Sequence, residues 1–385
     1  MKSKVLQSDI QRNECMLTGR LGGRGYDWWW HSFTGYSRET GKEKSFFIAF
    51  FLCNPDRGGR KPVFGQLPEN RRAGRKPSYL MVKAGAWGRD GAQLHRFFGW
   101  DELTLKGKAP FAVAAEDCYL SETATRGRIN VSAEDAKAHP EYMCQSGRMT
   151  WKLKIEKKIP FNVGYGAGKL FRELKAFQMY WHAEGMKTLY SGTVTWNGEV
   201  YDVKPESCWG YADKNWGSDF TMPWVWLSSN HMVSRLTGKK LTNSAFDIGG
   251  GRPVAFGIPM ERKLLGAFCY EGEGYEFNFS KFWMLPKTRF ECIETPDQLI
   301  WRVKQETLKA VLFVEIRCKK SEMLFMNYEN PDGIILHKRL WNGGTGTGRV
   351  RLYKKEGIYR KLIDDISVRN VGCEMGAETE PGQSI

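Results

Sequence analysis

Short apolar runs, and runs in which apolar and polar residues alternate, recur along the whole chain and are separated by Gly, Asn, Asp and Pro. Alternation with a period of two predicts β-strands, and the spacing of three to four that marks an amphipathic helix is rare. The pattern therefore predicts an all-β protein. Strands are expected at residues 45–53, 79–84, 149–155, 188–196, 224–229, 275–283, 299–305, 310–317 and 349–353.

Turn and helix signals complete this picture. Asn197-Gly198 lies between two alternating runs and predicts a two-residue hairpin turn. Residues 132–139 start with Ser132, a good helix cap, and residues 168–182 could carry one or two helical turns. Because strands do not alternate with helices, the predicted architecture is antiparallel, made of barrels or sandwiches.

The length of 385 residues exceeds that of one ordinary domain and suits two. We expect an N-terminal arm at residues 1–20 and β domains at residues 21–200 and 201–369. Residues 370–385 are rich in Gly and Glu, so a disordered tail is expected there.

Composition narrows the class of protein. The longest apolar run, residues 45–53, has the length of a buried strand and is too short for a membrane-spanning helix. No apolar stretch of a signal peptide follows Met1, so a cytoplasmic protein is expected. The nine cysteines are scattered without close pairs, which predicts neither disulfides nor a metal site.

The formal net charge of +15 permits contact with anionic partners. The basic residues are dispersed or lie in loops such as residues 57–61 and 71–76, which is typical of a solvated surface. Peripheral contact with an anionic membrane is the alternative that would suit a lipid-like ligand. Nucleic acid is not expected, because no groove-reading helix or nucleic-acid motif is present. The sequence does not indicate an oligomeric state.

The densest group of chemically useful side chains is Cys208-Trp209-Gly210-Tyr211-Ala212-Asp213-Lys214-Asn215-Trp216-Gly217, followed by Pro223-Trp224-Val225-Trp226. One interpretation is a loop whose Asp213 caps backbone N–H groups while Trp216 fills a core. The other is an aromatic cage around a single carboxyl group. Indole faces stabilise a developing carbocation, and a low dielectric keeps a carboxylic acid protonated.

A second group is Tyr26-Asp27-Trp28-Trp29-Trp30-His31. On a strand, Trp28 and Trp30 would share one face, and Asp27, Trp29 and His31 the other. Core packing is one interpretation. In the other, His31 reaches a pocket as a reserve general acid or base.

Other motifs are assigned structural roles. The glycine-rich residues 247–253 and 341–348 lack the flanking elements of phosphate-binding loops and predict β-turns. Cys208 is expected to pack in the core. The remaining histidines lack metal-ligand spacing; they are His95, His139, His231 and His337.

Residues 211–217, with residues 191–196 upstream and 223–226 downstream, resemble the tocopherol cyclase family, whose members carry a Tyr-Ala-Glu-Lys-Asn-Trp-Gly signature. The chain departs from it at Asp213, where the plant enzymes have Glu. More distantly, the region is similar to the lipocalin-like superfamily that includes carotenoid hydratases. Tyr211 and Asp213 match the Tyr-x-Asp pair of those enzymes, and Tyr180-Trp181-His182 lies upstream at about the right distance.

The resemblance implies two lipocalin-like β domains with a pocket at or near their interface, a hydrophobic small-molecule substrate, and neither a metal nor another cofactor. Asp213 would protonate an alkene, and Tyr211 and His182 would hold the acid. The implied substrate-binding residues are Trp181, Trp209, Lys214, Asn215, Trp216, Trp224, Trp226, Trp28, Trp30 and His31.

Three functions remain open at this point. The first is a tocopherol cyclase-like enzyme, or a hydratase or double-bond isomerase on the same scaffold. The second is a non-catalytic lipid carrier, which needs an apolar pocket but no buried neutral acid. The third is a structural β protein in which Trp and Tyr side chains fill the space.

Overall fold

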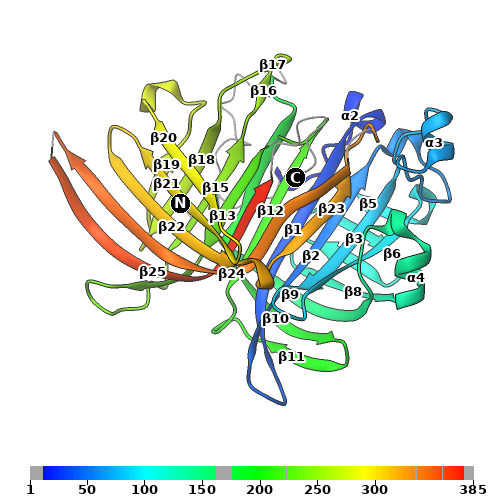
Figure 1. Ribbon diagram of the computed structural model, residues 1–385, viewed down its shortest axis with the longest axis horizontal. Helices are drawn as coiled ribbons and strands as arrows, with labels where there is room; N and C mark the ends of the chain where they lie inside the picture. Colours follow the sequence, from blue (N-terminus) through cyan, green and yellow to red (C-terminus); the bar gives the residue numbers. More distant parts are fainter. Residues whose placement is uncertain (1–11, 162–175, 222, 334–335, 358, 377–385) are drawn as a thin grey trace. The chain divides into compact units, whose positions relative to one another are not determined.

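The computed structural model describes residues 12–161, 176–221, 223–333, 336–357 and 359–376. The chain divides into two compact units. The first unit comprises Met1–Tyr165, Met179–Asp219 and Asn327–His337, and the second comprises Gly166–Gln178, Phe220–Met326 and Lys338–Ile385. Figure 1 shows that strands make up most of both units.

The sheet of the first unit contains twelve antiparallel strands in the order β4-β3-β2-β1-β11-β10-β9-β8-β7-β6-β5, and β12 pairs with both β1 and β10. These strands are β1 (Tyr26–Ser37), β2 (Glu43–Cys53), β3 (Tyr79–Ala86), β4 (Ala92–Phe98), β5 (Thr104–Lys106), β6 (Ala112–Ala115), β7 (Cys118–Ser121), β8 (Ala124–Val131), β9 (Gly147–Phe161), β10 (Met179–Trp196), β11 (Glu199–Val203) and β12 (Gly210–Gly217).

The second sheet contains eleven strands in the order β19-β18-β15-β13-β25-β24-β22-β21-β20, with β14 paired to β25 and β23 to β24. Its strands are β13 (Trp224–Ser229), β14 (His231–Ser234), β15 (Ala245–Gly251), β18 (Lys263–Tyr270), β19 (Glu273–Phe277), β20 (Lys287–Glu294), β21 (Gln298–Glu306), β22 (Ala310–Lys319), β23 (Leu324–Glu329), β24 (Leu336–Glu356) and β25 (Tyr359–Gly376). A separate small hairpin joins β16 (Val254–Ala255) to β17 (Ile258–Pro259).

The helices of the described residues are short. The α-helices are α2 (Arg20–Gly23), α3 (Pro68–Arg72) and α4 (Ala133–Ala138), and the 3-10 helices are η1 (Pro55–Arg57), η2 (Trp100–Glu102), η3 (Pro140–Tyr142), η4 (Phe282–Met284) and η5 (Lys320–Glu322). Ser132 caps α4 as predicted, because its Oγ accepts a hydrogen bond of 2.9 Å from the backbone N–H of Asp135.

Each sheet has its own apolar core. In the first unit, alternate residues of β1 and β2, among them Trp29, Phe33 and Phe50, pack with residues of β8 and β9 such as Trp151. In the second, Val225, Ile248 and Trp301 belong to a comparable cluster. The prediction of an all-β fold made of antiparallel sheets is confirmed. The Asn197-Gly198 turn is also confirmed, since both residues have positive φ and Trp196 pairs with Glu199.

The boundary between the units differs from the predicted residue 200. Strand β12 hydrogen-bonds to β1 and β10, so residues 201–219 belong to the first unit. The helix expected at residues 168–182 is wrong for residues 179–182, which lie in β10 because pairing to β12 outweighs local propensity. Residues 168–175 lie outside the described residues.

Three further predictions are corrected. The turns predicted at residues 247–253 and 341–348 are wrong for residues 247–251, which belong to β15, and for residues 341–348, which belong to β24. Their glycines allow close strand approach, since a Cβ on Gly251 would lie 2.0 Å from the Pro223 carbonyl oxygen and one on Gly348 2.0 Å from that of Glu315. The disordered tail expected at residues 370–385 is wrong for residues 370–376, which belong to β25, and residues 377–385 lie outside the described residues. The strand expected at 275–283 ends at Phe277.

Candidate functional site

The signature residues lie on β12, which has strand partners on both edges. Along β1, Trp30 pairs with Asp213 and Trp28 with Asn215. Along β10, Trp181 also pairs with Asn215. Residues paired directly across antiparallel strands share a face of the sheet. Residues 211, 213 and 215 therefore face one side of the sheet, and residues 212, 214 and 216 face the other.

The Asp213 carboxyl group is held by two neutral donors. The indole Nε1 of Trp181 donates to Oδ2 at 2.8 Å, and the hydroxyl group of Tyr211 donates to the same oxygen at 3.0 Å. All three side chains are buried, and that of Asp213 is 7% exposed. Because both hydrogen bonds enter Oδ2, a proton on this carboxyl group is assigned to Oδ1.

Indole rings lie on the Asp213 face of the sheet. The rings of Trp28 and Trp30 are 6.2 Å apart, and Trp30 stacks on Phe47 at 5.3 Å. This confirms that Trp28 and Trp30 share a face. Within the described residues, the buried Nε1 of Trp30 has no hydrogen-bond acceptor. A buried donor of this kind requires an explanation, and a polar group of a ligand is one.

The opposite face of β12 carries a buried ion pair. The Lys214 ammonium group donates to Oδ1 of Asp27, and both side chains are fully buried. The same ammonium lies 4.2 Å from the ring centroid of Trp29 and 4.8 Å from that of Trp216. Burial raises the pKa of Asp27 despite the neighbouring lysine. Lys214 and Trp216 therefore make their contacts on the face of the sheet opposite the Asp213 carboxyl group.

His182 is not brought to Asp213. It pairs with Lys214, so its ring lies on the Lys214 face of the sheet, and Trp181 is the β10 residue that reaches the acid. Burial, followed by the charges of Arg12 and Lys157, lowers the pKa of His182 to about 3. The expected role of His182 in holding the acid is therefore not supported, because adjacent strand residues point to opposite faces.

His31 also lies on the Lys214 face of the sheet. The Tyr190 hydroxyl group donates to the Tyr211 carbonyl oxygen at 2.9 Å, so the Nδ1–H of His31 donates to the hydroxyl oxygen at 2.8 Å. Burial lowers the pKa of His31 to about 3. A neutral His31 thus supports the backbone of the signature strand through Tyr190.

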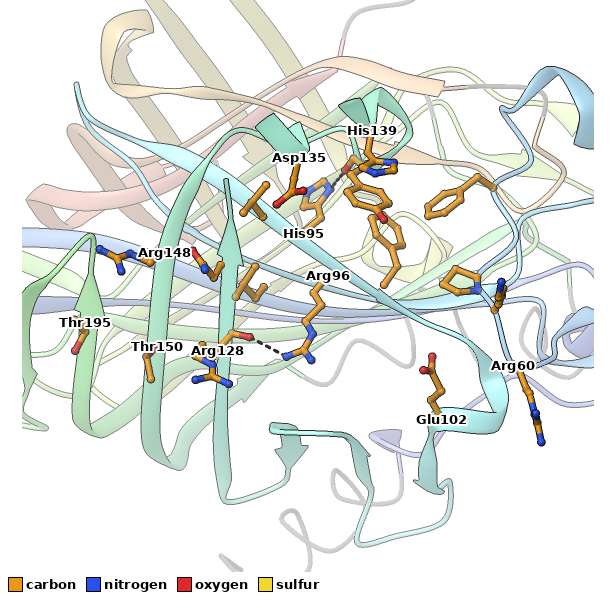
Figure 2. Close-up of a pocket in the computed structure, with 18 of the residues that line it drawn as sticks. Arg60, His95, Arg96, Glu102, Arg128, Asp135, His139, Arg148, Thr150 and Thr195 are labelled. Carbon is orange, nitrogen blue, oxygen red and sulfur yellow. Dashed lines mark hydrogen bonds between the residues drawn. The ribbon is translucent and has the colours of Figure 1, made fainter. Parts of the chain in front are cut away.

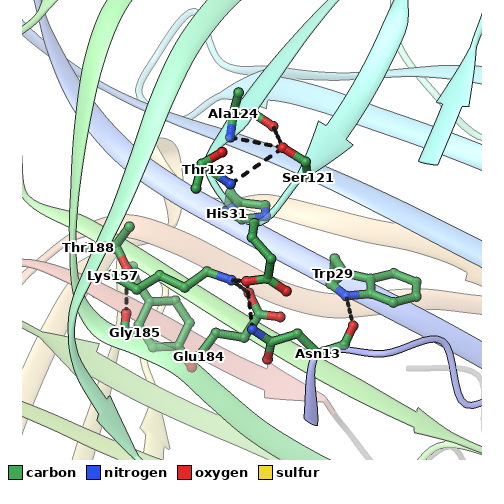
Figure 3. A network of polar contacts seen from close by, with 12 residues as sticks. Asn13, Trp29, His31, Ser121, Thr123, Ala124, Lys157, Glu184, Gly185 and Thr188 are labelled. Carbon is green, nitrogen blue, oxygen red and sulfur yellow. Dashed lines mark hydrogen bonds and ion pairs between the residues drawn. The ribbon is translucent and has the colours of Figure 1, made fainter. Parts of the chain in front are cut away.

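Figure 3 shows a charged network near His31 that the sequence did not predict. Lys157 of β9 forms ion pairs of 2.7 Å with Glu122 and 2.6 Å with Glu184, and Asn13 donates to Glu122 at 2.9 Å. Burial raises the pKa of Glu184 to about 7, and Lys157 opposes this shift. The one sequence signal was the position of Glu184 within the otherwise uncharged run at 179–186.

The other predicted tryptophans do not belong to β12. Trp209 precedes β12, and its backbone N–H donates to Thr34 at 3.0 Å. Trp224 and Trp226 belong to the second unit. Their indole nitrogens donate to Glu374 at 2.7 Å and to Asp247 at 3.0 Å.

A cleft with a volume of about 1210 Å³ lies in the first unit. Figure 2 shows the side chains that line it. Basic side chains, including Arg60, Arg128 and Arg148, line it together with the rings of Phe97 and Tyr142. None of the predicted site residues lines this cleft, so its volume does not bear on the chemistry of Asp213.

Among the described residues, no group of three or more His, Cys, Asp or Glu side chains could hold a metal ion. In the same residues, no helix is long and apolar enough to cross a membrane.

Comparisons with known proteins place the chain in a family. Among solved structures, kievitone hydratase from Nectria haematococca is similar with 10% identity and a TM-score of 0.47, covering 93% of this chain and 90% of that one. A putative AttH from Nitrosomonas europaea has 15% identity and a TM-score of 0.44, covering 92% and 95%. No curated protein matches. The family model described as tocopherol cyclase-like matches residues 111–377, and the chain therefore belongs to the tocopherol cyclase-like family.

Proposed function

We propose that this chain is a cofactor-independent enzyme in which Asp213 protonates an alkene of a hydrophobic, prenylated or polyunsaturated substrate, followed by cyclisation. The observation that carries the proposal is the buried Asp213 carboxyl group, whose Oδ2 accepts hydrogen bonds from Trp181 and Tyr211. Family membership supports an enzyme of the lyase, isomerase or hydratase type. The substrate and the fate of the cation belong to the proposal.

The proposed reaction begins with transfer of the proton from Oδ1 of Asp213 to the less substituted alkene carbon. The tertiary carbon becomes a cation, and Asp213 becomes a carboxylate. The two hydrogen bonds into Oδ2 stabilise this new negative charge, since bonds to charged groups are stronger than those to neutral ones. The indole faces of Trp28 and Trp30 stabilise the cation, at roughly 1–2 kcal/mol for each well-placed face.

Cyclisation completes the cycle without a net change in composition. A phenol oxygen of the substrate attacks the tertiary cation and forms the carbon–oxygen bond of a chromanol-type ring. The phenol oxygen then loses its proton to the Asp213 carboxylate, which restores the carboxylic acid. The Nε1–H of Trp30 has no acceptor within the described part of the chain, which supports its proposed role as a donor to an oxygen of such a substrate.

A hydratase or a double-bond isomerase is the alternative on the same residues. Water would attack the cation in a hydratase, and loss of a proton would give an isomerised alkene. A lipid carrier is the alternative without chemistry, and it would bind the same substrates without any need for the proton on Asp213.

The test uses purified wild-type protein and Asp213→Asn with a panel of prenylquinols and unsaturated lipids, without added cofactor. The proposal predicts an isomeric product that the wild-type protein forms and Asp213→Asn does not. In D₂O the product should carry a deuterium at the former alkene carbon. A product that gains water supports the hydratase alternative. Equal product formation by both proteins contradicts the assignment of Asp213.

Asp364→Asn is the matched control. Asp364 of the second unit is 2% exposed and, like Asp213, accepts from a tyrosine hydroxyl group, here that of Tyr270 at 3.1 Å. The control therefore removes a buried, hydrogen-bonded carboxylate without touching the proposed acid. It should retain turnover. Tight binding of the panel without product in any of the proteins would favour the carrier.

A further inference from the structure

Four large apolar side chains are exposed on two loops of the second unit. Phe256 is 62% exposed and Ile258 70% exposed on the β16–β17 hairpin, and Trp283 and Leu285 are each 61% exposed on the segment between β19 and β20. We call these four residues the exposed loop patch. Single exposed apolar residues are common on protein surfaces, but a cluster of large ones marks an interaction site.

The two loops of the patch are connected through Phe177. Its backbone forms a β-bridge with Ala255, and its ring lies 6.3 Å from the ring of Phe279. The backbone N–H of Phe256 also donates to the Ala176 carbonyl oxygen at 2.8 Å. Phe177 therefore connects the hairpin to the start of the segment that carries Trp283 and Leu285. Figure 1 shows the hairpin of β16 and β17 projecting beyond the sheet.

The backbone at two patch positions is unusual for apolar residues. Phe256 has φ of 49° and Leu285 has φ of 47°, in the left-handed region that glycine and asparagine favour. A bulky residue in this region is conformationally unfavourable. Such residues occur where a function requires them. Both left-handed residues carry exposed side chains.

Cationic side chains flank the patch in the sequence. Arg262 follows the hairpin, and Lys287 and Arg289 follow the second loop; all three are exposed. Exposed cations beside exposed aliphatic and aromatic residues are the combination that binds an anionic bilayer, because the apolar groups insert and the cations contact lipid phosphates. Tryptophan is also enriched at the membrane interface.

From these observations we propose that the exposed loop patch docks the protein on the surface of an anionic lipid bilayer. The charge favours a bilayer over a second copy of the chain, because a symmetric dimer through this patch would bring like charges together. The net charge of +15 acts in the same direction. The proposal goes beyond the reaction proposed above and does not depend on it, since vesicle binding requires no turnover.

The test is flotation of the purified full-length chain with vesicles of phosphatidylcholine alone or with added phosphatidylglycerol. The wild-type protein should bind the anionic vesicles, and raised salt should weaken the binding. A variant with serine at all four patch positions should lose at least about tenfold in vesicle partition, equivalent to about 1.4 kcal/mol. Its circular dichroism should match that of the wild-type protein, because the replaced side chains are exposed.

A matched pair of single variants separates the patch from general surface hydrophobicity. Ile258→Ser should reduce partition, whereas Leu236→Ser should not, although Leu236 is 57% exposed and also lies on the second unit. The double variant Lys287→Glu/Arg289→Glu should reduce binding to anionic vesicles only. Equal vesicle binding by the wild-type and patch variants would overturn the proposal. Lipid-free self-association that the patch variant abolishes would overturn it in favour of a dimer.

Discussion

Nε1 of Trp181 lies 2.8 Å from Oδ2 of Asp213, so the β10 and β12 strands are joined by a side-chain hydrogen bond beside their backbone pairing. The hydroxyl group of Tyr211, which precedes Asp213 by two residues on β12, donates to the same oxygen at 3.0 Å. One donor is therefore local in sequence and the other is not. The role of this arrangement can be tested by removing each donor in turn.

Trp181→Phe should lower kcat by roughly 10- to 100-fold, because it removes one hydrogen bond to a carboxylate that forms during proton transfer. Tyr211→Phe should have an effect of similar size. Steady-state kinetics on the substrate identified from the panel would measure both. Trp196→Phe is the control, since Trp196 is also a buried indole, 2% exposed, and lies at the far end of the same strand, β10, from Trp181. A kcat for Trp181→Phe equal to that of the wild-type protein would contradict the proposed role.

Local sequence patterns predicted the strands well and the partners of Asp213 only in part. Residues 224–229 form β13 with the predicted bounds, because alternation and flanking turns define such a strand locally. The pairing of β12 with β1 joins residues almost 190 positions apart, as in Asp27 with Trp216, and no local pattern encodes this register. The sequence therefore predicted Trp30 as a binding residue, but it did not predict that Trp30 pairs with Asp213.

The aromatic cage predicted around Asp213 consisted of tryptophans that are close to it in the sequence. Strand alternation instead sends Trp216 to the opposite face, where it covers the Lys214 ammonium group. The alternative prediction, a loop that contains Asp213 and Trp216, is also wrong, because this segment forms strand β12. Along β12, the odd-numbered residues 211, 213 and 215 share the face of the acid, and the even-numbered residues 212, 214 and 216 lie on the opposite face.

The Asp27–Lys214 ion pair should be strongly coupled. Lys214→Met should lower the free energy of unfolding by about 3–5 kcal/mol, because it leaves a buried carboxylate without its cation. Asp27→Asn/Lys214→Met should be more stable than Lys214→Met alone, since it buries no charge. Urea unfolding of the wild-type protein, Asp27→Asn, Lys214→Met and the double variant would measure the coupling energy between the two residues. Strictly additive changes in the free energy of unfolding would contradict the prediction.

Stability should fall as pH rises through the range in which Glu329 ionises. Burial raises its pKa from 4.5 to about 7, although the Gln66 N–H and the Tyr79 hydroxyl group donate to it. Between these values the folded protein keeps a proton that the unfolded chain has lost, so the free energy of unfolding decreases as pH rises. Glu329→Gln should remove this slope and stabilise the protein at pH 8 by on the order of 2–3 kcal/mol.

Glu306 provides a control of the opposite sign for that measurement. A hydrogen bond from Lys355 is the main cause that lowers the pKa of Glu306 to about 2. Its stabilising effect is present above pH 4.5 and is lost as pH falls toward 2, so Glu306→Gln should flatten the acid side of the profile. Urea unfolding as a function of pH would distinguish the two variants. A Glu329→Gln profile with the wild-type slope would show that Glu329 is not the titrating group.

The Tyr190 hydroxyl group connects His31 to the carbonyl oxygen of Tyr211, at 2.8 and 2.9 Å. Tyr190→Phe leaves a buried donor and a buried acceptor without this partner, so it should destabilise the protein by about 2–4 kcal/mol. Because the acceptor belongs to the backbone of β12, turnover should also fall while Asp213 is unchanged. Tyr201→Phe is the control, since the hydroxyl group of Tyr201 donates to the side chain of Glu199 at 2.7 Å, and its loss should change little. Urea unfolding and kcat, measured on both variants, check this prediction. Retained stability with reduced kcat would assign Tyr190 to positioning of β12 alone, and no change in either quantity would contradict the connection between His31 and the signature strand.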